Sequence, residues 1–208
     1  MNPIASRCRF LLSGLAAVAA TTLLAAPAQA ADVGSAASCP DTPVVQPFVQ
    51  WGDSSDYFLA PDGGFEQGGA GWTQLGRAAV QSGSEPFALN AGGDRSSLRL
   101  PAGSSATSSL FCIGAEHRSM RFVADAATSS RLDVDVIVGA GSTSGRTYRV
   151  ATVTGSGGWA PSAVVPMVVN EVAATQGGTL DVRLRFTPRG AGTWTIDDVF
   201  VDPYRRIW

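Results

Sequence analysis

The sequence predicts an all-β protein, a single antiparallel β-sandwich of jelly-roll type. Two runs, at residues 131–138 and 179–187, alternate apolar and polar side chains with a period of two, as strands with one buried and one wet face do. Stretches rich in glycine and serine, which favour turns, separate the β-rich runs. No stretch after residue 30 shows sustained helical periodicity. Short strands separated by such turns are typical of sandwiches and jelly rolls.

Residues 1–30 have the features of a secretory signal peptide. Arg7 and Arg9 precede an uncharged apolar stretch, and residues 28–30, "AQA", form the small-x-small pattern of a cleavage site. The competing hypothesis is a membrane anchor, but the apolar stretch falls short of the ~20 residues that a spanning helix needs. The sequence therefore predicts a secreted, extracellular protein with no membrane span in its mature chain.

The cysteines predict one disulfide bond. Removal of the signal peptide takes Cys8 with it and leaves Cys39 and Cys112. In an oxidising compartment, two remaining cysteines most simply pair. The alternative is a zinc site, which a single histidine, His117, and the lack of a CxxC motif disfavour.

The charge balance argues against nucleic acid as a partner. The chain has 15 Lys+Arg, all of them arginine, and 17 Asp+Glu. Two of these arginines leave with the signal peptide, so the mature chain is mildly acidic. It has no basic run of the kind that nucleic acid needs.

Residues 31–60 are expected to form an extended N-terminal arm, which Cys39 attaches to the rest of the chain. The alternative is a solvent-exposed linker. The arm has several aromatic side chains, which are too many for a free tail, so we expect it to lie against the sandwich. These residues are Phe48, Trp51, Tyr57 and Phe58.

The sandwich domain is expected at residues 61–204, followed by a short C-terminal tail at residues 205–208. Pro166 makes the run at 162–169 an edge strand or a bulge. The segment "VGAGSTSG" is interpreted as a hairpin turn, because a strand follows it where a nucleotide-binding loop requires a helix. The other candidate strands are 79–81, 97–100, 108–113, 120–124, 146–153 and 193–204.

Two motifs bracket the β-region, "DGGFEQGGAGW" at residues 62–72 and "TWTIDDVFVDPY" at residues 193–204. The pair resembles the first and last strands of the galactose-binding-like jelly roll found in many carbohydrate-binding modules. The whole chain also resembles secreted bacterial proteins of this plan. The resemblance implies a non-catalytic binding module for extracellular or cell-wall carbohydrate. Since other members are lectins or adhesion modules, the alternative is a structural or adhesive surface protein that binds another protein.

The resemblance also implies a structural calcium ion, with Glu66 and one of Asp197 or Asp198 as ligands. Adjacent side chains of a strand point to opposite faces, so one of the two aspartates must turn inward. A buried carboxylate needs a partner or a metal, and calcium takes about six to eight oxygen ligands. Glu66 and Asp198 are the preferred pair. The alternative is that one aspartate meets an arginine while the other is solvated.

Three aromatic residues, Trp51, Tyr148 and Trp159, are candidates for stacking on sugar rings. Trp159 follows a glycine-rich turn, although a single loop tryptophan more often has a packing role. Trp72 of the "GW" pair is expected to be structural.

Asp133 and Asp135 lie two residues apart on one strand face, near the carboxylate spacing of an inverting glycosidase. Arg183 and Arg185 show the same spacing on another strand, so a ladder of Asp–Arg pairs is the favoured interpretation. A Ser–His–Asp triad would have to use His117, but the chain has no G-x-S-x-G motif. The sequence therefore predicts no catalytic residue and no enzyme.

Overall fold

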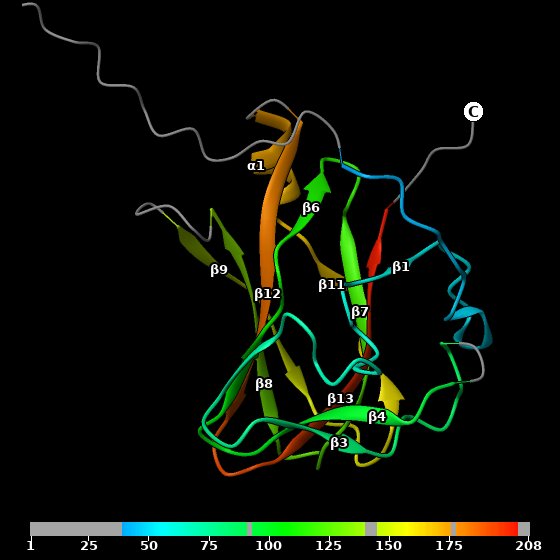
Figure 1. Ribbon diagram of the computed structural model, residues 1–208, viewed down its shortest axis with the longest axis vertical. Helices are drawn as coiled ribbons and strands as arrows, with labels where there is room; N and C mark the ends of the chain where they lie inside the picture. The colour runs from blue at the N-terminus through cyan, green and yellow to red at the C-terminus, as the bar shows by residue number, and fades with distance from the viewer. Residues whose placement is uncertain (1–38, 91–92, 140–144, 176–177, 204–208) are drawn as a thin grey trace, which may run out of the picture. The chain divides into compact units, whose positions relative to one another are not determined.

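Two antiparallel β-sheets pack face to face in the computed structural model, which describes residues 39–90, 93–139, 145–175 and 178–203 (Figure 1). The predicted β-sandwich is therefore confirmed. The predicted signal peptide, residues 31–38 of the predicted arm and the predicted tail at 205–208 lie outside the described residues. Within the described ranges, helix is confined to a 3-10 turn, η1 (Val49–Trp51), and to α1 (Asn170–Thr175). Neither helix is long or apolar enough to cross a membrane.

The seven-stranded sheet has the order β10-β7-β13-β4-β3, with β1 beside β13 and β11 beside β7. Pro166 lies in the two-residue strand β11, which pairs only at its β7 side, as expected for proline at a sheet edge. The strands are β1 (Phe58–Leu59), β3 (Ala79–Ser82), β4 (Ser96–Leu100), β7 (Ser119–Asp125), β10 (Ala160–Pro161), β11 (Val165–Pro166) and β13 (Trp194–Asp202).

The six-stranded sheet has the order β2-β5-β12-β8-β9, with β6 also beside β12. Its strands β8 and β9 pair antiparallel on either side of the predicted hairpin turn. The strands are β2 (Thr73–Leu75), β5 (Ser105–Thr107), β6 (Phe111–Gly114), β8 (Arg131–Val138), β9 (Arg146–Thr154) and β12 (Thr179–Arg189).

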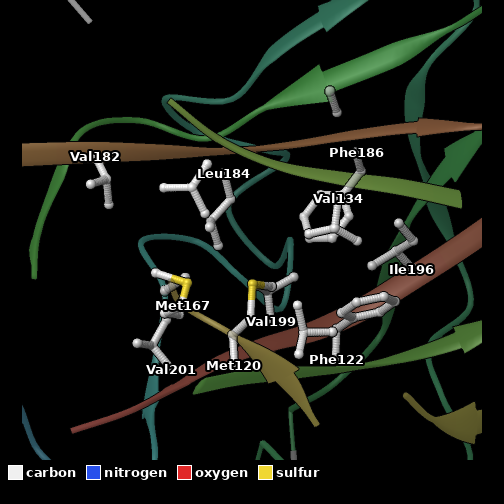
Figure 2. Close-up of a cluster of buried hydrophobic side chains, with 14 of the residues drawn as sticks. Met120, Phe122, Val134, Met167, Val182, Leu184, Phe186, Ile196, Val199 and Val201 are labelled. Atoms are coloured by element: carbon white, nitrogen blue, oxygen red, sulfur yellow. The ribbon is translucent and has the colours of Figure 1, made fainter. Parts of the chain in front are cut away.

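The main core fills the space between the sheets. Figure 2 shows Val182, Leu184 and Phe186 of β12 facing Met120 and Phe122 of β7. These side chains occupy alternate positions of their strands, so the period-two pattern in the sequence accounts for the buried face. The core also takes in Trp72, as predicted. Its ring stacks on Phe186, and its Nε1–H donates to the Pro61 carbonyl at 2.9 Å.

The N-terminal arm packs on the outer face of the seven-stranded sheet, as expected. Its side chains Phe48 and Tyr57 are buried against Phe200 of β13 and Val123 of β7, and we call these four residues the outer aromatic cluster. The predicted Cys39–Cys112 disulfide is present, with a Cα–Cα distance of 5.3 Å, and it ties the start of the described arm to β6.

Arg121 on β7 connects the N-terminal arm to the seven-stranded sheet. Its guanidinium pairs with Asp53 of the arm at 2.8 Å and donates two hydrogen bonds to the Ser162 carbonyl, at 2.9 and 3.1 Å. It also lies 4.4 Å from the centroid of the Phe48 ring. One buried cation thus joins three segments of the chain.

The variant Arg121→Lys is expected to lower the free energy of unfolding by about 1–2 kcal/mol, measured by urea denaturation. An ammonium cannot reproduce the planar fork that contacts Asp53 and Ser162 together. Arg99→Lys, on the exposed side of β4, is the matched control and should unfold like the unaltered protein. Equal stability of the two variants would contradict this role for Arg121.

Candidate functional site

Three carboxylates, Glu85, Asp94 and Asp198, meet beside the middle of β13. One oxygen of each lies within 4.8 Å of the oxygens of the other two. Two ligands on opposite sides of a calcium ion are up to about 5 Å apart, because each Ca–O distance is about 2.3–2.6 Å. These three residues, which we call the acidic group, could therefore hold a metal ion.

A β-bulge in the last strand brings Asp198 into this group. The pairing of β13 with β7 shifts between Asp197 and Phe200, and Asp198 has a φ of 48°, in the left-handed region. Asp197 and Asp198 are both fully buried. The alternative in which one aspartate is solvated and the other meets an arginine is therefore wrong. A regular strand would have separated the two carboxylates, whereas the bulge lets both turn inward.

The two aspartates have different partners. The Asp197 carboxylate accepts hydrogen bonds from the backbone N–H of Glu85 at 3.1 Å and of Asp198 at 2.9 Å. Neither carboxylate oxygen of Asp198 has a hydrogen-bond partner among the described residues, and the same holds for Asp94. Asp197 thus holds the backbone around the acidic group in place. Asp198 and Asp94 contribute carboxylates that accept no hydrogen bond from the described residues.

The electrostatics of the acidic group favour a cation. Burial, together with the neighbouring carboxylates, raises the pKa of Asp198 to about 9. Burial is also the main cause that raises the pKa of Asp197 to about 8 and of Asp94 to about 6. A divalent cation would relieve both the burial cost and the mutual repulsion of these carboxylates.

Glu66 lies beside the acidic group and is not one of the three residues that converge. Its carboxylate accepts hydrogen bonds from the backbone N–H of Arg95 at 2.7 Å and of Ser96 at 2.6 Å, and the bond from Arg95 is the main cause that lowers its pKa. Its charge also raises the pKa of Asp94. Glu66 therefore holds the segment that carries Asp94.

The segment 62–72, which the resemblance implies to be a first strand, is a series of turns. Asp62 and Phe65 have positive φ angles, and the Asp62 carboxylate accepts hydrogen bonds from the N–H groups of Gln67 and Ala70. A Cβ on Gly64 would lie 3.1 Å from Asp198 Oδ1, so the glycine lets this turn approach the acidic group closely.

A surface cavity borders the acidic group. A cavity of about 410 Å³ is lined by Glu85, Asp94 and the neighbouring loop residues. The cavity therefore borders two of the three members of the acidic group. The remaining lining residues are Ser84, Pro86, Ala88, Gly93 and Arg95.

Sequence reasoning missed Glu85 and Asp94. Both lie in the loop between β3 and β4, where no periodicity marks an inward-facing position. The Glu85 carboxylate accepts hydrogen bonds from the backbone N–H of Phe87 and Leu89, which fold the loop around it. The one available signal was an isolated acidic residue between glycine, serine and proline.

Two of the three candidate stacking residues each contact the outer aromatic cluster. Trp51 is 36% exposed, and its ring meets Phe87 edge-on with centroids 4.8 Å apart. Trp159 is half-buried and packs against the outer aromatic cluster, which includes Phe48, a ring that Trp51 also contacts. Tyr148 is separate from them, since it packs against the main core from β9.

The Asp–Arg ladder is present on the outer face of the six-stranded sheet. Asp135 pairs with Arg149 at 2.6 Å and with Arg185 at 2.8 Å, and Asp133 pairs with Arg149 at 2.6 Å and with Arg189. Burial opposes ionisation of Asp135, but the hydrogen bonds from Arg149 and Arg185 lower its pKa. These two carboxylates are therefore held as salt-bridge partners.

His117 and Arg183 also have structural partners. The Nδ1 atom of His117 accepts a hydrogen bond from the backbone N–H of Gly114 at 2.7 Å, within the turn between β6 and β7. Arg183, expected in the ladder, donates to the Ser108 carbonyl at 2.9 Å.

Comparison with known proteins gives structural likeness only. No family model matches the chain, and no curated protein matches it. TmCBM61, solved in complex with β-1,4-galactotriose, has a TM-score of 0.40 and 16% identity, and the match covers 69% of this chain and 96% of that one. A family 11 carbohydrate-binding module from Clostridium thermocellum, in complex with a β-1,3-1,4-mixed-linked tetrasaccharide, has a TM-score of 0.42, 8% identity and coverages of 69% and 94%. A xylan-binding domain from CBM 22 has a TM-score of 0.38, 18% identity and coverages of 71% and 100%.

Proposed function

We propose that the protein is a secreted, non-catalytic module that binds extracellular or cell-wall carbohydrate and is stabilised by one calcium ion. The observation that carries the proposal is that two partly exposed indole rings contact the outer aromatic cluster: Trp51 meets Phe48, and Trp159 packs against the cluster. Flat aromatic faces stack on the apolar faces of sugar rings.

The two rings are held on a rigid support. Phe48 and Phe87 contact Trp51, and the arm that carries Trp51 is fixed by Arg121 and by the Cys39–Cys112 bond. Side chains that are already ordered lose little conformational entropy when a ligand binds. The arm therefore has a role in the proposed function, because it builds the platform.

The role is non-catalytic because the carboxylates that the sequence offers for catalysis have structural partners. Asp133 and Asp135 are almost fully buried beneath arginines. Asp198 belongs to the acidic group, in which it would serve as a calcium ligand. A glycosidase needs two carboxyl groups that face each other across the substrate.

Calcium is the ion that fits the acidic group best. All three converging side chains supply oxygen, which calcium prefers, and none supplies the nitrogen or sulfur typical of zinc sites. The amide of Asn90 lies beside Gly64, close to Asp198, and could add a further oxygen ligand. A bound calcium ion would neutralise the buried carboxylates and join the loop between β3 and β4 to the last strand.

The variant Trp159→Ala is expected to weaken binding to a recognised glycan by about tenfold or more, because it removes one stacking face. A glycan array identifies the ligand, and isothermal titration calorimetry measures the change. Trp51→Ala should have a similar effect. Leu75→Ala, which removes an exposed apolar side chain from β2 of the other sheet, should bind like the unaltered protein. Wild-type affinity in both folded tryptophan variants would overturn the proposed platform.

A second candidate function is a structural or adhesive protein that binds another protein through the arm. Val44, Val45 and Val49 are 37%, 50% and 51% exposed, close in sequence to Trp51. Exposed apolar side chains gathered on one segment suit a protein interface. Failure to bind any glycan, together with a protein partner lost on Val45→Asp, would favour this candidate.

A further inference from the structure

The outer face of the six-stranded sheet gathers arginines from three strands. They lie at alternate positions to apolar residues of the main core, so their side chains belong to the face away from it. We call this surface the arginine face. Its members are Arg131 on β8, Arg149 on β9, and Arg183, Arg185 and Arg189 on β12.

The arginine face presents positive charge to solvent because its aspartates lie beneath the arginines. Asp133 is 3% exposed and Asp135 is 1% exposed. The side chains of Arg149, Arg185 and Arg189 are 42%, 35% and 58% exposed. With Asp181 also on this face, five arginines stand against three aspartates, whereas the whole chain has a net charge of −2.

The buried aspartates hold the guanidinium groups in place. Asp135 accepts from Nε of Arg149 and from Nε and an amino group of Arg185. Asp133 accepts from Nε of Arg189 and from Thr152. A guanidinium has five N–H donors in one plane, and these contacts use only some of them. An incoming anion would meet donors whose side chains are already ordered.

We propose that the arginine face binds an anionic polysaccharide, whose carboxylate or sulfate groups accept hydrogen bonds from these arginines. Arginine pairs with carboxylate and sulfate-like oxygens through its planar fork. Single-stranded nucleic acid fits less well, because the strands of this face, as far as the structure describes them, have no outward aromatic side chain on which bases could stack. The face is independent of Trp51 and Trp159, which lie over the other sheet.

The test compares short oligogalacturonides with their methyl esters, in excess calcium, by isothermal titration calorimetry. The two probes share one sugar backbone, and esterification replaces each charged carboxylate with a neutral methyl ester. Binding of the acid that weakens with added salt, with no binding of the ester, is expected. A second pair, sulfated dextran and dextran, distinguishes sulfate from carboxylate as the recognised group. Equal affinity for acid and ester, with no preference for sulfated over neutral dextran, would overturn the proposal.

Variants then place the site. Arg183→Gln and Arg189→Gln are each expected to weaken binding of the acidic probe by about three- to tenfold. Arg99→Gln makes the same charge change on the seven-stranded sheet and should have no effect. All three variants should keep any neutral-glycan binding that depends on Trp159. A failure of the proposed arginine-face site can therefore be distinguished from a failure of the proposed tryptophan site. Equal losses in all three variants, or tighter binding of single-stranded DNA than of the acidic probe, would contradict the assignment. The comparison of acid and ester on the unaltered protein does not depend on the folding of any variant.

Discussion

Removal of calcium with a chelator is expected to lower the melting temperature of the protein by roughly 10 °C at about pH 8. An ion present at about a thousand times its dissociation constant stabilises the folded state by about 4 kcal/mol. In its absence, Asp94 and Asp198 stay buried without donors among the described residues. Differential scanning calorimetry in calcium and in chelator measures the change.

The effect of the chelator should grow as the pH rises. In the metal-free protein the pKa values of Asp94, Asp197 and Asp198, about 6, 8 and 9, lie above their ordinary value of 3.8. The folded state therefore binds more protons than the unfolded state between these values. The stability that these three groups contribute is fully present below about pH 4 and is lost as the pH rises through the range from about 6 to 9.

Two variants separate this effect from general electrostatics. Asp198→Asn removes one buried charge, so its melting temperature should respond weakly to both the chelator and the pH. Asp56→Asn changes a half-buried arm residue that accepts a hydrogen bond from Gln46, and its response to the chelator should match that of the unaltered protein. An unchanged melting temperature in chelator at about pH 8 would refute the calcium site.

Loss of the disulfide should cost about 4 kcal/mol of stability, measured by urea denaturation of a double variant, Cys39→Ser with Cys112→Ser. The bond closes a loop with a sequence separation of 73 residues, so it restricts the unfolded chain strongly. It also fixes the start of the described arm beside β6.

Reduction of the unaltered protein provides the control for the disulfide prediction. In dithiothreitol the unaltered protein should fall to the stability of the double variant, while the double variant itself should not change. If the oxidised protein and the double variant unfold at the same urea concentration, the bond does not form in solution.

The sandwich could be predicted because its longest strands obey local rules. In β8 and β12 the apolar residues fall on alternate positions, and both strands occur where the pattern placed them. The run at 162–169 was harder, and only Val165–Pro166 of it forms a strand. The other apolar residues of this run lie in a connecting segment along the edge of the seven-stranded sheet.

The acidic group could be predicted only in part. The double aspartate in the last strand pointed to a buried charge, but the bulge at Asp198 depends on how β13 pairs with β7. Glu85 and Asp94 reach Asp198 only when the loop between β3 and β4 closes over the strand. Such a contact between distant segments leaves no periodic trace in the sequence.

The side-chain directions in β9 likewise could not be predicted from the sequence. A register shift between β8 and β9 at Val134 and Asp135 places Tyr148 opposite Val136, whose side chain points into the core. Arg149 then falls opposite Asp135 on the outer face. The sequence likewise shows no continuous run of charge for the arginine face, because its members come from three strands.

The measurement that tests the carbohydrate-binding account most directly is a glycan array and polysaccharide pull-down with the disulfide-bonded protein in calcium. The released sugars should be analysed in parallel. The account predicts saturable retention on at least one glycan, without any cleavage of it. Failure to bind every glycan, or the appearance of shortened products, would contradict it.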